Sequence, residues 1–172
     1  MATTVKGKLI TPAEGEIGLE WPTSLYLTAH CQVGEAANVS ASDEYKFFWN
    51  DTIEHTLDMF EELRSVLVAG GIVSYMPLSS VERTEEYNRE HGGIPGSHHI
   101  TGEAFDWCFS KGGLKVSMTN GLRKVISAIW QYVCSKNGVV GYICWYTHGF
   151  HFDAAKDGEF VIYDYRNTSK DW

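Results

Sequence analysis

Apolar positions recur at helical spacing in two stretches of the chain. Over residues 51–69 they fall every three or four positions, on one face of a helix that Asn50 or Asp51 can cap. That face consists of Ile53, Leu57, Phe60, Leu63 and Leu67. A second amphipathic helix is predicted over residues 120–136. Its apolar face consists of Leu122, Val125, Ile129 and Val133.

Short apolar runs predict strands elsewhere. They cover residues 25–28, 72–77, 104–109, 139–145, 150–153 and 160–163. Segments rich in glycine, proline or small polar residues predict loops at 34–42 and 91–96, and the polar segment 79–90 is expected to be helical in part. Helices combined with adjacent strands near the C-terminus predict an α+β fold, with an antiparallel sheet flanked by helices.

Length, charge and cysteine content limit the kinds of protein and partner that fit this chain. A chain of 172 residues predicts one domain over residues 1–172, with its motifs in a core of about 72–153 and an unassigned N-terminal extension at 1–50. A net charge of −8 without a basic stripe argues against nucleic acid and membrane surfaces as partners. Residues 1–10 hold no long apolar run, so we expect no signal peptide and synthesis in a cytoplasm. The four cysteines form no Cys-x-x-Cys pair, which argues against a thiolate zinc site.

Two histidine-containing segments carry the candidate chemistry. The string Ser97 to Asp106 contains His99 and Asp106, and His151 lies in a second cluster, Thr147 to Asp153. Two histidines and a carboxylate with an open fourth position are what a catalytic zinc needs. His151 alternates with Phe150 and Phe152, so a strand would point it away from both rings. The plainer alternatives are a surface histidine with an unrelated aspartate, and a core histidine near a capping aspartate.

Other residues near these segments are candidates for supporting roles. Asp153 can be a second acceptor that fixes the tautomer of His151. His148 can act as a general base, as a fourth ligand or as a plain loop histidine. Arg83, with Asn88 nearby, can hold a substrate carboxylate or stabilise an oxyanion, although the many charged neighbours also fit a solvated helix face. His98 should point away from His99 in an extended chain and not share its metal.

Taken together, these residues resemble the zinc D-alanyl-D-alanine carboxypeptidase family, which includes phage endolysins and peptidoglycan endopeptidases. The family shares its fold with the hedgehog signalling domain. Its pattern is an Arg, an Asn, a Gly-rich loop, Ser-x-His-x-x-Gly-x-Ala-x-Asp, and a late His followed two residues on by Asp. In this chain the pattern falls on Arg83, Asn88, Gly92-Gly93, Ser97, His99, Gly102, Ala104, Asp106, His151 and Asp153.

The resemblance implies one zinc ion held by His99, Asp106 and His151, and hydrolysis of a peptide bond in peptidoglycan stem peptides. It implies that Arg83 contacts a substrate carboxylate or the oxyanion, and that Ser97, with Asn88, binds substrate. Many members carry Glu or Asp three residues before the last zinc histidine, where this chain has His148. That departure keeps open a second hypothesis, a zinc-stabilised structural or binding module with a degenerate catalytic centre. Without a signal peptide, the expected setting is a phage enzyme released at lysis or a component of the phage particle, with a bacterial protein that recycles wall fragments as the alternative.

Overall fold

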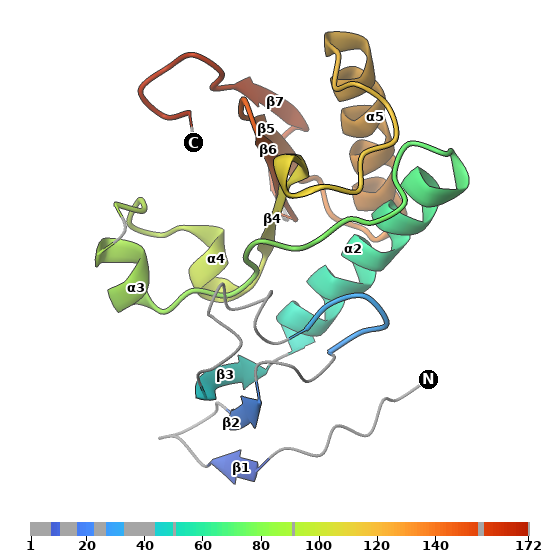
Figure 1. Cartoon of the computed structure of the whole chain (residues 1–172). Helices are drawn as coiled ribbons and strands as arrows, with labels where there is room; N and C mark the ends of the chain where they lie inside the picture. Colours follow the sequence, from blue (N-terminus) through green and yellow to red (C-terminus); the bar gives the residue numbers. More distant parts are fainter. Residues whose placement is uncertain are drawn as a thin grey trace.

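The computed structural model describes residues 8–10, 17–22, 27–32, 44–49, 51–90, 92–154 and 157–171. Its helices are α2 (Asp51–Ala69), α3 (Glu85–Glu90), α4 (His98–Thr101) and α5 (Asn120–Lys136), with a short 3₁₀ turn η1 (Phe109–Lys111). Its strands are β1 (Lys8–Ile10), β2 (Ile17–Pro22), β3 (Glu44–Trp49), β4 (Ala104–Cys108), β5 (Tyr142–Trp145), β6 (Gly149–Asp153) and β7 (Val161–Asp164) (Figure 1). None of the helices in these ranges is long and apolar enough to cross a membrane.

The C-terminal half is organised around a four-stranded sheet with the order β4-β6-β5-β7. β6 pairs antiparallel with β4 and with β5, and β7 joins the edge of β5 in parallel. The predicted α+β class is therefore confirmed. The sheet is antiparallel at its centre and mixed at one edge, because the chain between β6 and β7 crosses over before it returns beside β5.

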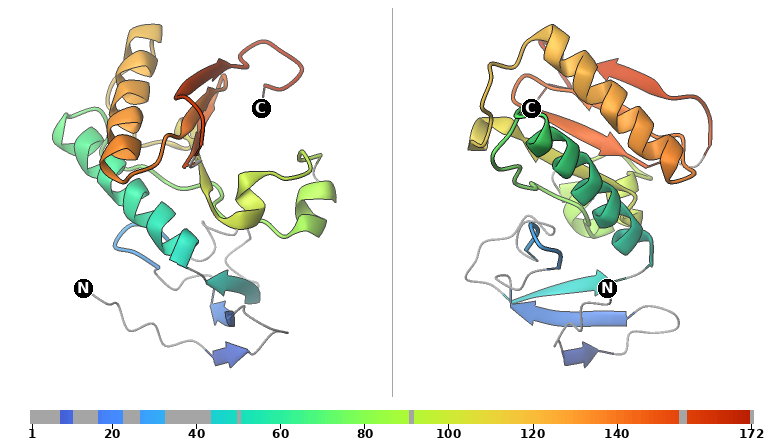
Figure 2. Two further views of the ribbon diagram at one scale, coloured as in Figure 1. Left: turned by 180° about the vertical axis from the view of Figure 1, so that it is seen from behind. Right: turned by 90° about the vertical axis from the view of Figure 1, so that its right-hand side faces the viewer.

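One face of this sheet is covered by α2 and α5, as the two views of Figure 2 show. Alternation along the strands sends Phe105 and Trp107 of β4, and Phe150 and Phe152 of β6, into that layer. The rings of Phe60 and Trp130, from the two helices, meet Phe105 edge-on with centroids 5.6 and 5.4 Å away. The other side chains of the same strands must consequently point to the opposite face.

Both long helices begin and end as the sequence predicts. The apolar face predicted for α2 is buried throughout. The face predicted for α5 is wrong in part, because Val125 is 49% exposed. The buried residues of α5 are Arg123, Ile126, Ser127, Trp130, Val133 and Cys134.

Two predicted strands are wrong where the structure describes them. Within residues 72–77, only Val73 forms a β-bridge, to Leu114, and the segment then runs as an irregular chain. Leu27 is in a bend whose amide donates to the Cys31 carbonyl, so the end of the 25–28 segment is a turn. The loop predicted at 34–42, the first two residues of 25–28, Asn50 and His91 lie outside the described residues.

The sequence left residues 1–50 unassigned, and the structure gives this region strands. β1, β2 and β3 form an antiparallel sheet in that order. The β2–β3 pairing runs from Ile17 opposite Trp49 to Pro22 opposite Glu44.

Candidate metal centre

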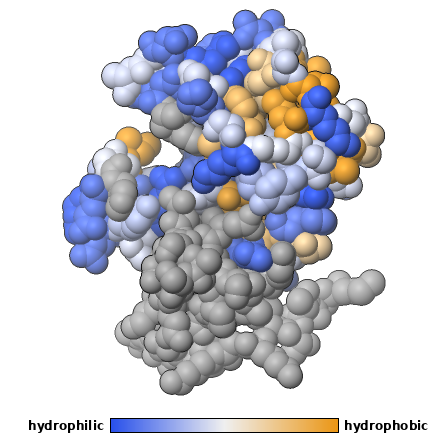
Figure 3. Space-filling view, in the orientation of Figure 1, coloured by the Kyte–Doolittle hydropathy of each residue, from blue (hydrophilic) through white to orange (hydrophobic). Residues whose placement is uncertain are grey.

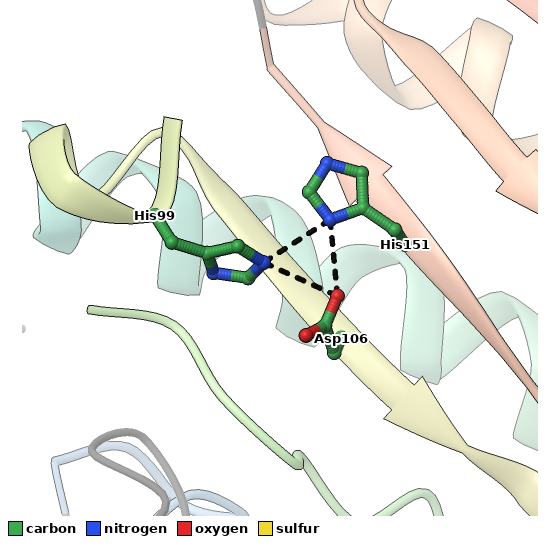
Figure 4. Close-up of side chains that lie close together, drawn as sticks. All are labelled: His99, Asp106 and His151. Carbon is green, nitrogen blue, oxygen red and sulfur yellow. Dashed lines mark hydrogen bonds and ion pairs between the residues drawn. The ribbon is translucent and has the colours of Figure 1, made fainter. Parts of the chain in front are cut away.

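Three side chains that the sequence singled out converge on the open face of the four-stranded sheet. His99 comes from α4, Asp106 from β4 and His151 from β6 (Figure 4). Asp106 and His151 are direct neighbours across the β4–β6 pairing. Because Phe150 and Phe152 lie in the core, His151 points to the other face, as its alternation with them predicts. The molecule is hollowed on this side, between the α3 region and the C-terminal segment (Figure 3).

The turn between α4 and β4 brings His99 to Asp106. Gly102 ends α4 in the left-handed conformation, with φ 76°, which glycine adopts at little cost. A Cβ at this position would lie 2.3 Å from the Cγ1 atom of Ile53 on α2. The glycine therefore permits both the tight turn and the close packing of α4 on α2.

The donor atoms form a small triangle. His99 Nε2 lies 3.2 Å from Asp106 Oδ1 and 3.1 Å from His151 Nδ1, and His151 Nδ1 lies 3.0 Å from the same oxygen. Donors to a tetrahedral zinc, with bonds of about 2.0–2.2 Å, stand about 3.3–3.6 Å apart, so the triangle has nearly the size that a zinc ion requires.

The partners of the outer ring nitrogens orient the two imidazoles. His99 Nδ1 donates to the Val81 carbonyl at 2.8 Å, which leaves the lone pair of Nε2 facing the triangle. His151 Nε2 lies 3.5 Å from Asp153 Oδ2, which directs its Nδ1 to the triangle. Two nitrogens and a carboxylate oxygen that face one another are a donor set suited to a divalent cation. The residues present therefore fit the zinc that the sequence implies.

Charge in the site follows from burial and from these contacts. Burial lowers the pKa of His99 and outweighs the attraction of Asp106, so its imidazole is neutral at pH 7. Burial also opposes a charge on His151, but the Asp106 and Asp153 carboxylates prevail and raise its pKa to about 9. Burial resists ionisation of Asp106 as well, yet the protonated His151 beside it holds its pKa below the usual range. The metal-free site thus carries a proton on His151 that a cation must displace.

Arg83 contacts the metal-site carboxylate directly. Its Nη2 donates to Asp106 Oδ2 at 2.6 Å, and its Nε donates to Ser80 Oγ at 3.0 Å. The Asp106 amide donates to the Ser80 carbonyl at 2.9 Å, so the segment before α3 lines the edge of β4. Arg83 therefore fixes the oxygen of Asp106 that does not face the two histidines.

A second set of contacts surrounds Asp153, whose side chain is fully buried. His98 Nδ1 donates to Asp153 Oδ2 at 2.7 Å, and the Tyr142 hydroxyl donates to the same carboxylate. The sequence reasoning missed both partners. Tyr142 could have been found from the hairpin, because a two-residue turn at Thr147-His148 pairs position 142 with 153. The side chains of His98 and His99 have different partners, as expected. The reason differs from the expected one, because the two residues lie in a helix and not in an extended chain.

The remaining predicted residues lie on α3 and on the segments that lead into α4 and β6. His148 is exposed in the tight turn between β5 and β6, where the Tyr146 amide donates to the Gly149 carbonyl. Ser97 precedes α4, is partly exposed and makes no side-chain cap bond. Asn88 is 3% exposed, and its Nδ2 donates to the Ile94 carbonyl at 2.9 Å, so it holds the loop ahead of Ser97.

A mixed sheet backed by two helices carries two imidazoles and a carboxylate that converge on its open face, and this donor set suits one divalent metal ion. The sequence profile of the Peptidase M15 family matches residues 28–137, more than half of the chain, and the chain belongs to this family. The match confirms the resemblance, and it includes His99 and Asp106 but ends before His151. The fold itself brings the third donor to the other two. A comparison with curated proteins finds no match.

Proposed function

We propose that the chain is a zinc-dependent peptidase that hydrolyses a peptide bond in the stem peptides of peptidoglycan, as a D-Ala-D-Ala carboxypeptidase or an endopeptidase. The convergence of His99 Nε2, Asp106 Oδ1 and His151 Nδ1 within 3.2 Å, in a member of the Peptidase M15 family, carries the proposal. A phage lysis enzyme, or a component of a phage particle, is the setting we propose for this activity.

The zinc would be held by His99, Asp106 and His151, and when bound it supplies Lewis acidity to a scissile carbonyl and to a water nucleophile. Arg83 keeps the Asp106 carboxylate in place and stands, partly exposed, where it can also meet a substrate oxygen. Ser97 offers a hydroxyl at the start of α4, and Asn88 maintains the loop that presents it. Asp153 holds the outer nitrogen of His151.

His148 is the proposed general base. An exposed imidazole at the hairpin tip can accept a proton from the attacking water and pass it to the leaving amine. His148→Ala should lower turnover by about 10²–10⁴-fold while zinc stays bound, since general acid–base groups contribute on that scale. His30→Ala is the matched control and should leave turnover unchanged. It removes an exposed histidine whose Nδ1 lies 2.7 Å from Glu61 Oε2.

Digestion of purified peptidoglycan tests the function directly. The zinc-loaded protein should release fragments whose masses identify the bond that is cut, a chelator should stop the release, and added zinc should restore it. Asp106→Asn should be inactive under every condition. Cleavage that survives complete metal removal would contradict the proposal.

A second candidate is a zinc-stabilised binding or structural module without catalysis. The observation in its favour is that an exposed His148 stands where many relatives carry an acidic residue. Stoichiometric zinc with no release of peptide from peptidoglycan, at any pH between 6 and 9, would select this candidate.

A further inference from the structure

Four tyrosines form a continuous line that starts at the metal triangle. Tyr142 stacks on His151 with centroids 5.7 Å apart, and Tyr163 meets Tyr142 edge-on at 5.6 Å. Tyr165 lies parallel to Tyr163 at 5.9 Å and continues to Tyr146 at 5.8 Å. We refer to these four residues, Tyr142, Tyr146, Tyr163 and Tyr165, as the tyrosine strip.

The register of the sheet explains why the tyrosine strip is continuous with the metal site. Direct cross-strand neighbours point to the same face, and His151, Cys144 and Tyr163 are such neighbours on β6, β5 and β7. Tyr142 is likewise the neighbour of Asp153. The strip therefore lies on the open face that carries the triangle, opposite the layer of α2 and α5.

The tyrosine strip is exposed at Tyr163 and partly exposed at its other three members. Tyr163 is 41% exposed, and every residue of the edge strand β7 is exposed. Asp164 and Arg166, which are paired at 2.6 Å, belong to the other face, where Arg166 Nη1 donates to Asn120 Oδ1 at the start of α5. Lys170 lies over the Tyr165 ring at 5.1 Å. Neighbouring aromatic faces with polar hydroxyl tips favour a ligand made of flat, hydroxyl-bearing rings.

We propose that the tyrosine strip binds the sugar rings of the glycan strand that carries the stem peptide. The inference rests on the proposed function, because it places the glycan next to the peptide bond that the triangle would cut. The apolar face of a pyranose ring packs on a tyrosine ring, while the sugar hydroxyls reach phenol oxygens. Since Tyr142 touches His151, a glycan on the strip lies close to the point where its attached peptide must enter the site.

Titration calorimetry with chitohexaose, a neutral chain of N-acetylated sugar rings, tests the binding without any hydrolysis. Tyr163→Ala and Tyr165→Ala should each raise the Kd at least about tenfold, whereas Tyr163→Phe should keep most of the affinity because its ring remains. Tyr132→Ala is the control, because Tyr132 is 61% exposed but lies on α5. An unchanged thermal midpoint would show that each variant is folded.

A second measurement compares the rate on intact peptidoglycan with the rate on free stem peptides. The ratio of the two rates should fall at least about tenfold in Tyr163→Ala and stay at the wild-type value in Tyr132→Ala. If the wild type cuts both substrates and Tyr163→Ala keeps the ratio, the inference is wrong while the proposed function stands. If the wild type cuts neither but binds chitohexaose through the strip, the function is wrong while the binding surface stands. The inference would be overturned if the wild type did not bind chitohexaose. It would also be overturned if the wild type formed a dimer and the strip variants were monomers, because the strip would then be a contact between two copies of the chain.

Discussion

Asp106 is held in the metal centre by contacts at both carboxylate oxygens and at its backbone amide. Its Oδ1 faces both histidines, its Oδ2 accepts from Arg83, and its amide donates to the Ser80 carbonyl. A carboxylate with a side chain only 7% exposed needs such partners to remain charged. Arg83 is consequently a positioning residue for the carboxylate, in addition to any contact with substrate.

Replacing this arginine should weaken metal binding. Arg83→Met leaves Asp106 Oδ2 without its charged partner, and we expect zinc affinity to fall by about 10–100-fold, the usual effect of losing a group that holds a ligand. Competition with a chromogenic chelator measures the change. Arg89→Met, which removes an exposed arginine of α3, should have no effect. Equal affinity in wild type and Arg83→Met would refute the positioning role.

Zinc affinity should also rise with pH. The pKa of His151 is raised to about 9 in the metal-free protein, so below this pH each zinc must displace one proton. Affinity should therefore increase about tenfold per unit between pH 6 and 8. The same proton stabilises the metal-free fold below a pH of about 6.5, and that contribution is lost as the pH rises through 9. Affinity independent of pH, after correction for the chelator, would exclude a proton on His151.

Sequence alone predicted the three members of the triangle because metal chemistry restricts the residue types and because the family pattern spaces them. It could not predict what surrounds them. Arg83 and Asp106 are 23 positions apart, and His98 and Asp153 are 55 apart. No local periodicity encodes contacts over such separations, and they become visible only when β4, β6 and α4 are placed together.

At the scale of elements, the two long helices were predictable and the irregular segments were not. Hydrophobic spacing fixed the extent of α2 and α5 because it extends over several turns. The face of α5 was misjudged because polar residues are buried there. Ser127 accepts from Trp145 Nε1 at 3.0 Å, and the Arg123 guanidinium lies 5.1 Å from the centre of the Phe150 ring. Such partners come from β5 and β6, so the sequence of the helix does not reveal them.

The turn after α4 can be tested by adding one methyl group. Gly102→Ala forces a left-handed residue to carry a Cβ that meets Ile53, and the free energy of unfolding should fall by about 2–4 kcal/mol. Gly92→Ala is the matched control, because Gly92 has φ 73° with open space around it. It should lose only about 1 kcal/mol. Urea unfolding compares the two, and equal losses would show that contact with Ile53 is unimportant.

At the scale of the whole molecule, the metal site joins parts of the chain that are far apart in the sequence. α4 precedes the sheet, β4 is one of its edges, and β6 arrives after α5. His99 and His151 are separated by 52 positions. An ion bound between them therefore exists only in the folded chain, and its binding free energy adds to the stability of the fold.

Zinc should accordingly raise the thermal midpoint of the protein. At a free zinc concentration about 100-fold above the Kd, linkage gives about 2.7 kcal/mol, or about 5–10 °C for a domain of this size. Differential scanning calorimetry with zinc, with magnesium and with a chelator measures the shift.

Magnesium should give little shift of the thermal midpoint, because it prefers oxygen ligands and the triangle offers two nitrogens. Asp106→Asn should lose most of the zinc shift, since an amide oxygen replaces the only carboxylate of the triangle. A shift of the same size in this variant would mean that zinc binds elsewhere on the chain.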